Sequence, residues 1–167
     1  FRNVLSLPAR KIFHNAMYDV CFIRAAGLQI AGEIVDTMIA GSLVDENRFR
    51  YDLGSMGRDY LGKGKNEASL AETAKEWGID PKSEMYKLPA MYVGEYAEQD
   101  AKLTLELWQE MKKQILMEEV SSIFELETEL FPCLVDMRFL GVRVDTEAAY
   151  TLKPVSYTHL TLPTRDD

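Results

Sequence analysis

Asp100 occupies a position where a core residue of a helix is expected. Residues 91 to about 120 follow the helical period, and one face of this helix carries, at spacings of 4, 3, 4 and 4, Tyr96, Asp100, Leu103, Leu107 and Met111. A carboxylate on a buried face destabilises the fold unless a cation or hydrogen bonds compensate it. A bound metal ion would provide that compensation, which makes Asp100 a candidate metal ligand.

Asp19 is the second acidic residue of interest, and taken alone it is ambiguous. It lies in the first turn of a helix predicted over residues 16–26, where an aspartate commonly complements the helix dipole. Tyr96 is equally open to a structural interpretation, as a core tyrosine whose hydroxyl reaches the surface. His14, at the end of a predicted strand, is expected to make a hydrogen bond and has no assigned chemistry.

The segment from residue 48 to residue 65 combines positive charge with aromatic rings. It contains five basic residues against two acidic ones, a local charge of +3, and Phe49, Tyr51 and Tyr60 lie among them. Cations and aromatic faces together suit a single nucleic-acid strand, which offers phosphates and bases. An exposed helix face followed by a loop at residues 62–65 explains the same pattern equally well.

The elements that must position these residues indicate an α/β layer. Residues 11–13 are predicted to form a buried strand, and Asn15 is predicted to cap the helix over 16–26. Gly27 would end that helix in a left-handed conformation. A second strand is expected over residues 33–37, followed by an apolar helix, so that strands and helices alternate.

The C-terminal part of the sequence changes character. A helix is predicted over residues 121–140, ending at Gly141. From residue 155 onward the chain is threonine-rich, has no amphipathic period and resembles the translated read-through of a sequencing adapter, so we exclude it, with His159, from the reasoning on function. The start at Phe1 is interpreted as a cut end.

The composition is that of an ordinary globular protein. The 167 residues are 47% hydrophobic and 28% charged, and no apolar run approaches the ~20 residues of a membrane helix. Cys21 and Cys133 lie far apart, which suggests neither a zinc site nor a disulfide framework; we expect reduced thiols in a cytoplasmic protein. The net charge of −8 argues against a coat for duplex DNA but allows a carboxylate site for one strand end.

Residues 14–19 (HNAMYD) and 96–100 (YAEQD) together resemble the second and third motifs of the tyrosine-type four-carboxylate 3′-5′ exonucleases. Their order, their separation of about 80 residues and the intervening VDTM at 35–38 match this family. Residues 125–145 are similar to the stretch that joins the proofreading domain to the polymerase domain in the DNA polymerase I family, family A. The resemblance covers about residues 10–150, and the sequences KLPA and GEYAEQD look more like phage than cellular members.

This resemblance implies a ribonuclease-H-like fold and hydrolysis of the terminal phosphodiester at the 3′ end of single-stranded DNA. Two divalent cations, Mg²⁺ or Mn²⁺, about 4 Å apart would activate the attacking water and stabilise the leaving oxygen. It further implies that Asp100 binds one ion directly, that Asp19 supports the second largely through water, and that Tyr96 orients the nucleophilic water. Contacts to the terminal nucleotides and a phosphate are implied for Asn15, Tyr18 and Arg50.

The sequence departs from the family at its first motif. An Asp-x-Glu should precede the second motif, but the only one in this chain lies at residues 145–147, where Asp145 is predicted to cap a helix instead. We therefore expect an exonuclease fold lacking its first strands, helix-rich with a residual small sheet, and inactive by itself. Residues 1–120 would form the partial exonuclease domain, 121–154 the start of the connection to a polymerase domain, and 155–167 the read-through.

Three alternatives remain open at this stage. An RNA-trimming nuclease of the same superfamily would share both motifs, although residues 125–145 lead toward a polymerase domain. A nuclease-like domain that has lost its metals could serve as a scaffold or DNA clamp, which the presence of Asp19, Tyr96 and Asp100 makes less favoured. An unrelated α/β binding module is the third alternative.

Overall fold

The computed structural model describes residues 2–65, 68–80 and 83–160 of the chain. The chain divides into two compact units, one ending at Val135 and one beginning at Asp136. Helices dominate, and the first unit holds a small parallel sheet of two strands, which confirms the predicted fold class. Of the predicted read-through segment, residues 161–167 lie outside the described residues.

The two strands place the residues that follow each of them at the same edge of the sheet. β1 (Lys11–Phe13) and β2 (Ile34–Asp36) pair in parallel, and α2 (Ala16–Ala25) forms the crossover that a parallel pair requires. In the register, Phe13 lies opposite Asp36, so both strands end at the same level. The residues that follow β1 therefore meet the residues that follow β2 at one edge of the sheet.

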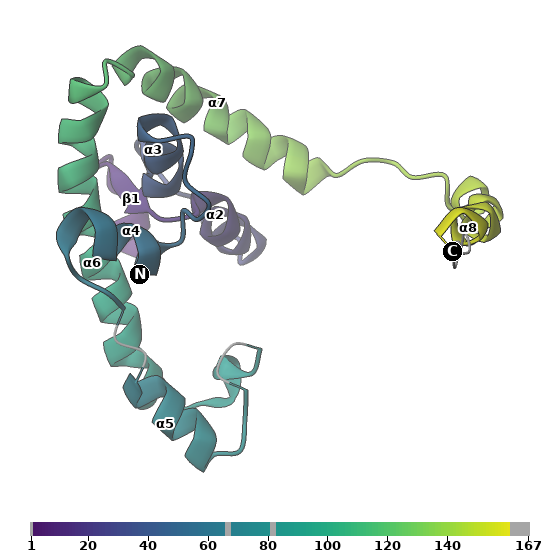
Figure 1. Cartoon of the computed structure of the whole chain (residues 1–167), viewed down its shortest axis with the longest axis horizontal. Coiled ribbons are helices and arrows are strands. Elements are labelled where there is room, and N and C mark those ends of the chain that lie inside the picture. Colours follow the sequence, from purple (N-terminus) through teal and green to yellow (C-terminus); the bar gives the residue numbers. More distant parts are fainter. Residues whose placement is uncertain (1, 66–67, 81–82, 161–167) are drawn as a thin grey trace, which may run out of the picture. The chain divides into compact units, whose positions relative to one another are not determined.

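The other elements follow in chain order: α1 (Arg2–Leu5), α3 (Thr37–Val44), α4 (Leu53–Leu61), α5 (Ala68–Glu76), the 3₁₀ turn η1 (Met85–Lys87), α6 (Ala90–Met117), α7 (Ser121–Leu140) and α8 (Thr146–Leu160). Figure 1 shows α3 and α4 beside the long α6, and these two pairs make extensive contact. No helix within the described part of the chain has both the length and the apolar character needed to cross a membrane.

The larger hydrophobic cluster fixes α6 in place. Leu107 and Met111 of α6 and Met56 of α4 are fully buried, and Leu103 is 5% exposed. This confirms the apolar face predicted from the spacing of the α6 residues. Asp100 lies on the same face, one turn before Leu103, so packing of the core determines where its carboxylate emerges.

A smaller cluster holds α2. Ala16 and Val20 of α2 pack with Phe131 and Val135 of α7. Because these four side chains are buried, α2 has an apolar attachment on its inner side while Asp19 stays at the exposed surface. The two aspartates are thus carried by helices that belong to two separate hydrophobic clusters.

The predicted capping of α2 by the side chain of Asn15 is wrong. Asn15 has a left-handed backbone with φ of 62°, and its side chain makes no capping hydrogen bond. The carboxylate of Asp36, at the end of β2, instead accepts the backbone N–H groups of Asn15 and Ala16 at 2.9 and 2.7 Å. Two other terminal predictions are confirmed: Gly27 has φ of 71°, and Asp145 accepts the backbone N–H of Ala148.

Candidate active site

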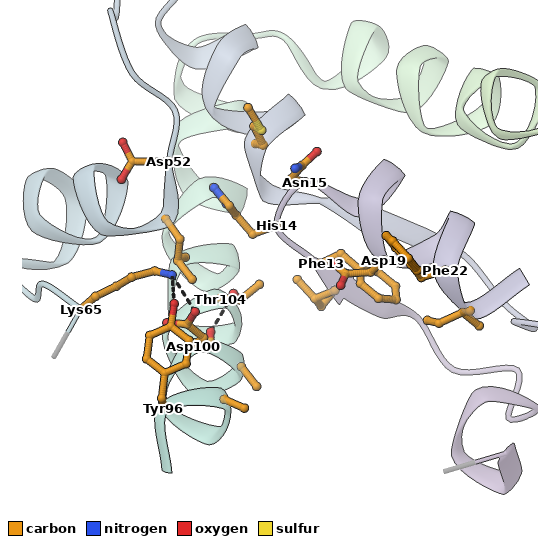
Figure 2. A pocket seen from close by; sticks show the side chains of 16 residues that line it. Phe13, His14, Asn15, Asp19, Phe22, Asp52, Lys65, Tyr96, Asp100 and Thr104 are labelled. Carbon is orange, nitrogen blue, oxygen red and sulfur yellow. Dashed lines mark hydrogen bonds and ion pairs between the residues drawn. The ribbon is translucent and has the colours of Figure 1, made fainter. Parts of the chain in front are cut away.

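A cavity of about 920 Å³ opens in the first unit between the end of β1, α2, the start of α4 and α6 (Figure 2). Four of the six predicted site residues line it, namely Asn15, Asp19, Tyr96 and Asp100. Lys65 and Asp52 line it as well. The cavity thus brings together two motifs that lie about 80 residues apart in the sequence.

On the α6 side, a lysine bridges the two predicted site residues. The Lys65 ammonium donates to the Asp100 carboxylate, with 2.6 Å between Nζ and Oδ2, and to the Tyr96 hydroxyl at 3.1 Å. Burial opposes the charge of Lys65, but the hydrogen bonds to Asp100 and Tyr96 outweigh it, and the pKa of Lys65 lies above its usual value. Figure 2 shows dashed lines from the Lys65 ammonium to both the tyrosine hydroxyl and the aspartate carboxylate.

The loop that carries Lys65 is held against α4. Gly62 ends α4 in the left-handed region, with φ of 65°, and the backbone N–H of Lys63 then donates to the carbonyl of Gly57. A Cβ atom at Gly57 would lie 2.7 Å from the carbonyl oxygen of Lys63, so glycine is needed for this close approach. The turn directs the chain back toward α6, which α4 already contacts.

On the α2 side, Asp19 lies in an unfavourable electrostatic environment. The surrounding protein removes part of the water around its carboxylate, and the negative charge of Asp36 lies nearby. Both effects raise the pKa of Asp19, and a backbone hydrogen bond offsets them only in part. A positive charge brought to this side of the cavity would relieve the repulsion.

Asp36 and Thr37 organise the strand ends beside Asp19. The Asp36 carboxylate also accepts the backbone N–H of Met38 at 2.9 Å, so it caps α3 as well as α2. The Thr37 hydroxyl donates to the Phe13 carbonyl at 3.1 Å and lies 2.9 Å from Nδ1 of His14. This confirms the predicted hydrogen bond at His14, whose pKa is lowered chiefly by burial, against the opposing charge of Asp36.

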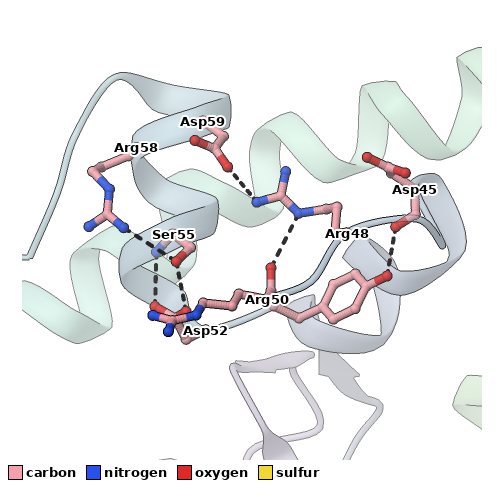
Figure 3. A network of polar contacts seen from close by, with 8 residues as sticks. Asp45, Arg48, Arg50, Asp52, Ser55, Arg58 and Asp59 are labelled. Carbon is pink, nitrogen blue, oxygen red and sulfur yellow. Dashed lines mark hydrogen bonds and ion pairs between the residues drawn. The ribbon is translucent and has the colours of Figure 1, made fainter.

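A second polar network lies at the start of α4 (Figure 3). The Asp52 carboxylate accepts the backbone N–H and the hydroxyl of Ser55, at 2.9 and 2.7 Å. These hydrogen bonds, helped by the charges of Arg50 and Arg58, lower the pKa of Asp52. The Arg48 guanidinium forms an ion pair with the Asp59 carboxylate, with 2.5 Å between Nη2 and Oδ2, so its positive charge is balanced within the protein.

Two residues implied by the resemblance lie outside the cavity lining. Tyr18 is 57% exposed, and its ring packs against Phe22 with 4.8 Å between ring centroids. Phe22 itself lines the cavity. Arg50 is exposed and is not among the lining residues. Its charge acts on Asp52, which is a lining residue. Tyr18 and Arg50 therefore relate to the cavity indirectly, because Tyr18 packs on the lining residue Phe22 and the charge of Arg50 acts on the lining residue Asp52.

The sequence analysis did not assign functions to Lys65 and Asp36. Lys65 carried a weak signal, as one of two lysines in the glycine-rich loop that ends the basic segment. Asp36 directly precedes an apolar helix, which is the position of a capping residue. Neither pattern reveals the partner, because Asp100 lies 35 positions from Lys65, and Ala16 lies 20 positions from Asp36.

The donor chemistry of the cavity fits a divalent cation. Asp19 and Asp100 offer the carboxylate oxygens that Mg²⁺ and Mn²⁺ prefer, and Lys65 shows that Asp100 already accepts a cationic partner. Within the described ranges, no group of three or more His, Cys, Asp or Glu side chains forms a metal site. Two aspartates are fewer than such a group, so they fit as part of a larger ligand set.

Comparison with known proteins finds similarity to an exonuclease family and to DNA polymerases. Residues 1–116 match the sequence model of a family described as 3′-5′ exonuclease. A DNA-directed DNA polymerase of Pseudomonas phage M6 is 33% identical over 135 residues, which are 80% of this chain and 20% of that protein. A DNA polymerase DpoZ of Acinetobacter phage SH-Ab 15497 is 30% identical, covering 84% of this chain and 24% of its own length.

A cellular protein shows a similar match. The DNA polymerase I of Chloroflexus aurantiacus is 27% identical over 149 residues, 82% of this chain and 14% of that protein. The chain thus spans between 14% and 24% of the length of these curated relatives. In each relative, the matched part is a fraction of a much longer polymerase.

Proposed function

This chain belongs to the 3′-5′ exonuclease domain family of DNA polymerase I-type enzymes, and we propose that it serves as the proofreading part of a DNA polymerase. Its substrate would be the single-stranded 3′ end of a primer, from which it hydrolyses the terminal phosphodiester. The observation that carries this proposal is the convergence of Asp19, Tyr96 and Asp100 on one cavity. The names of the relatives favour DNA over RNA as the substrate.

We assign the metal-binding role to the two aspartates. Asp100 would hold one divalent cation directly and Asp19 would support a second, with the remaining ligands supplied from outside the described residues. The bound cations would supply an activated water and stabilisation of the leaving 3′ oxygen. The raised pKa of Asp19 supports the assignment, because a nearby cation would offset the charge of Asp36.

The other residues would position the substrate. Tyr96 lies one helical turn before Asp100, where its hydroxyl can orient the attacking water. Asn15 would contact the terminal nucleotide from the cavity wall. Tyr18, packed on Phe22, offers an exposed aromatic face for a base, and Arg50 would contact a phosphate from the rim.

The remaining parts of the proposal concern the context of the domain. We propose that the polymerase domain belongs to the same parent chain and that the protein acts in the cytoplasm, that of the host cell in the case of a phage. The free thiols of Cys21 and Cys133 are compatible with that compartment. We further propose that the chain by itself is inactive, because the described residues contribute only two of the four carboxylates that the family resemblance implies.

A substitution at Asp100 tests the proposed function. In a polymerase that carries this domain, Asp100→Ala is expected to abolish trimming of a mismatched primer while nucleotide incorporation stays largely unchanged. Glu106→Ala is the matched control, since Glu106 lies on the same helix and pairs with Lys63 outside the cavity. Trimming by Asp100→Ala at the rate of the control would refute the assignment. Parallel assays on DNA and RNA primers would test the RNA-trimming alternative.

A further inference from the structure

Lys65 places a positive charge on the carboxylate that the proposed function assigns to a metal ion. Its Nζ lies 2.6 Å from Oδ2 of Asp100, and both side chains are largely shielded, with 22% and 25% exposed. The same ammonium donates to the Tyr96 hydroxyl and lies 5.2 Å from the centre of that ring. One cation therefore holds together the two α6 residues of the proposed site.

A divalent cation on Asp100 would compete with this contact. Mg²⁺ binds carboxylate oxygens at about 2.0–2.1 Å, so an ion on this carboxylate would lie only a few ångströms from the ammonium. Two positive groups at that separation repel each other strongly in a partly shielded site. The lysine can move away because its charge sits at the end of a flexible four-carbon stem.

We propose that Lys65 is a positioning residue that holds Asp100 and Tyr96 together in the metal-free protein and releases Asp100 when a divalent cation binds. This inference rests on the proposed function, since it takes Asp100 to be a metal ligand. Lys65 compensates the Asp100 carboxylate in the absence of metal, and it lowers the affinity of the site for the ion. The site would consequently load only above a metal concentration set by this competition.

A neighbouring lysine shows that the arrangement at Lys65 is particular to the cavity. Lys63, two residues earlier in the same loop, pairs with Glu106 of the same helix, also at 2.6 Å. The Lys63 side chain is 60% exposed, and neither Lys63 nor Glu106 lines the cavity that holds Asp100. The two ion pairs join the same loop to the same helix at the same distance. They differ in how far their side chains are shielded from solvent and in their position relative to the proposed site.

Direct measurement of Mn²⁺ binding tests the inference. The signal of free Mn²⁺ in electron paramagnetic resonance would be followed during titration of a polymerase that carries this domain, its Lys65→Met variant and its Lys63→Met variant. Methionine keeps an unbranched stem and removes the charge. We expect Lys65→Met to bind Mn²⁺ about tenfold more tightly than the unsubstituted chain, because one competing cation is gone. Lys63→Met should bind as the unsubstituted chain does.

The outcomes separate this inference from the proposed function. Equal, weaker or undetectable Mn²⁺ binding by Lys65→Met would overturn the inference, since removing a competitor must expose the site. Loss of packing alone would not tighten binding, and circular dichroism would confirm that each variant is folded. Addition of Asp100→Asn to Lys65→Met is expected to abolish the gain. Unchanged binding in that double variant would instead refute Asp100 as a ligand, and with it the proposed function.

Discussion

The two sides of the cavity carry their aspartates in opposite electrostatic states. Asp100 on α6 has an ammonium partner at 2.6 Å, which it shares with Tyr96. Asp19 on α2 faces the charge of Asp36 and a partial loss of water, and its pKa is raised. The negative charge on the α6 side is thus neutralised by the protein itself. On the α2 side, an added cation would relieve the repulsion between Asp19 and Asp36.

The two sides also differ in how they are held. α6 is anchored by fully buried apolar side chains, among them Leu107 and Met111. The start of α2 is anchored by backbone hydrogen bonds to the Asp36 carboxylate, with a smaller apolar cluster behind it. Burial therefore determines the position of Asp100, while a polar cap is central to that of Asp19.

We expect the largest loss of stability when Asp36, which caps α2, is substituted. Asp36→Ala removes the acceptor of three backbone N–H groups at two helix starts, and we expect the free energy of unfolding to fall by about 4 kcal/mol. Amide hydrogen exchange should show α2 losing protection before α6. Asp36→Asn keeps one carbonyl acceptor and should lose less. A decrease below about 1 kcal/mol for the alanine variant would contradict this account of the cap.

Truncation of the α6 core should weaken the opposite side. Leu107→Ala leaves a cavity at a fully buried position, and we expect a loss of about 3 kcal/mol in chemical denaturation. Leu105→Ala is the matched control, because Leu105 lies on the same helix with 52% of its surface exposed and should change stability by less than about 0.5 kcal/mol. Similar losses in both variants would show that burial of this face does not anchor α6.

We expect a smaller effect from the pH dependence of stability, which reports on the environment of Asp19. The pKa of Asp19 is raised in the folded protein above 3.8, so the folded state binds this proton more tightly than the unfolded chain does. The contribution of Asp19 to stability is therefore fully present below pH 3.8 and is lost as the pH rises through the raised pKa. Relative to Asp19→Asn, the unsubstituted chain should lose stability over this window in urea titrations. A difference that stays constant with pH, or grows, would contradict the raised pKa.

Local patterns predicted most of the elements around the site. The strand at residues 11–13 and the long helix after residue 91 follow from apolar spacing, and the helix after Asn15 also has a terminal glycine. The cap of α2 could not be predicted in this way, because the local pattern at Asn15 suits a side-chain cap. The actual acceptor comes from the neighbouring strand of the sheet.

Residue types at short spacings were sufficient to predict the family and the helical faces, because both depend on local patterns along the chain. The ion pair between Lys65 and Asp100 and the capping of the Asp19 helix by Asp36 arise only once the chain is folded. These contacts join residues 35 and 20 positions apart. Their formation depends on how α4 packs against α6 and how β2 aligns with β1, and no local spacing encodes that alignment.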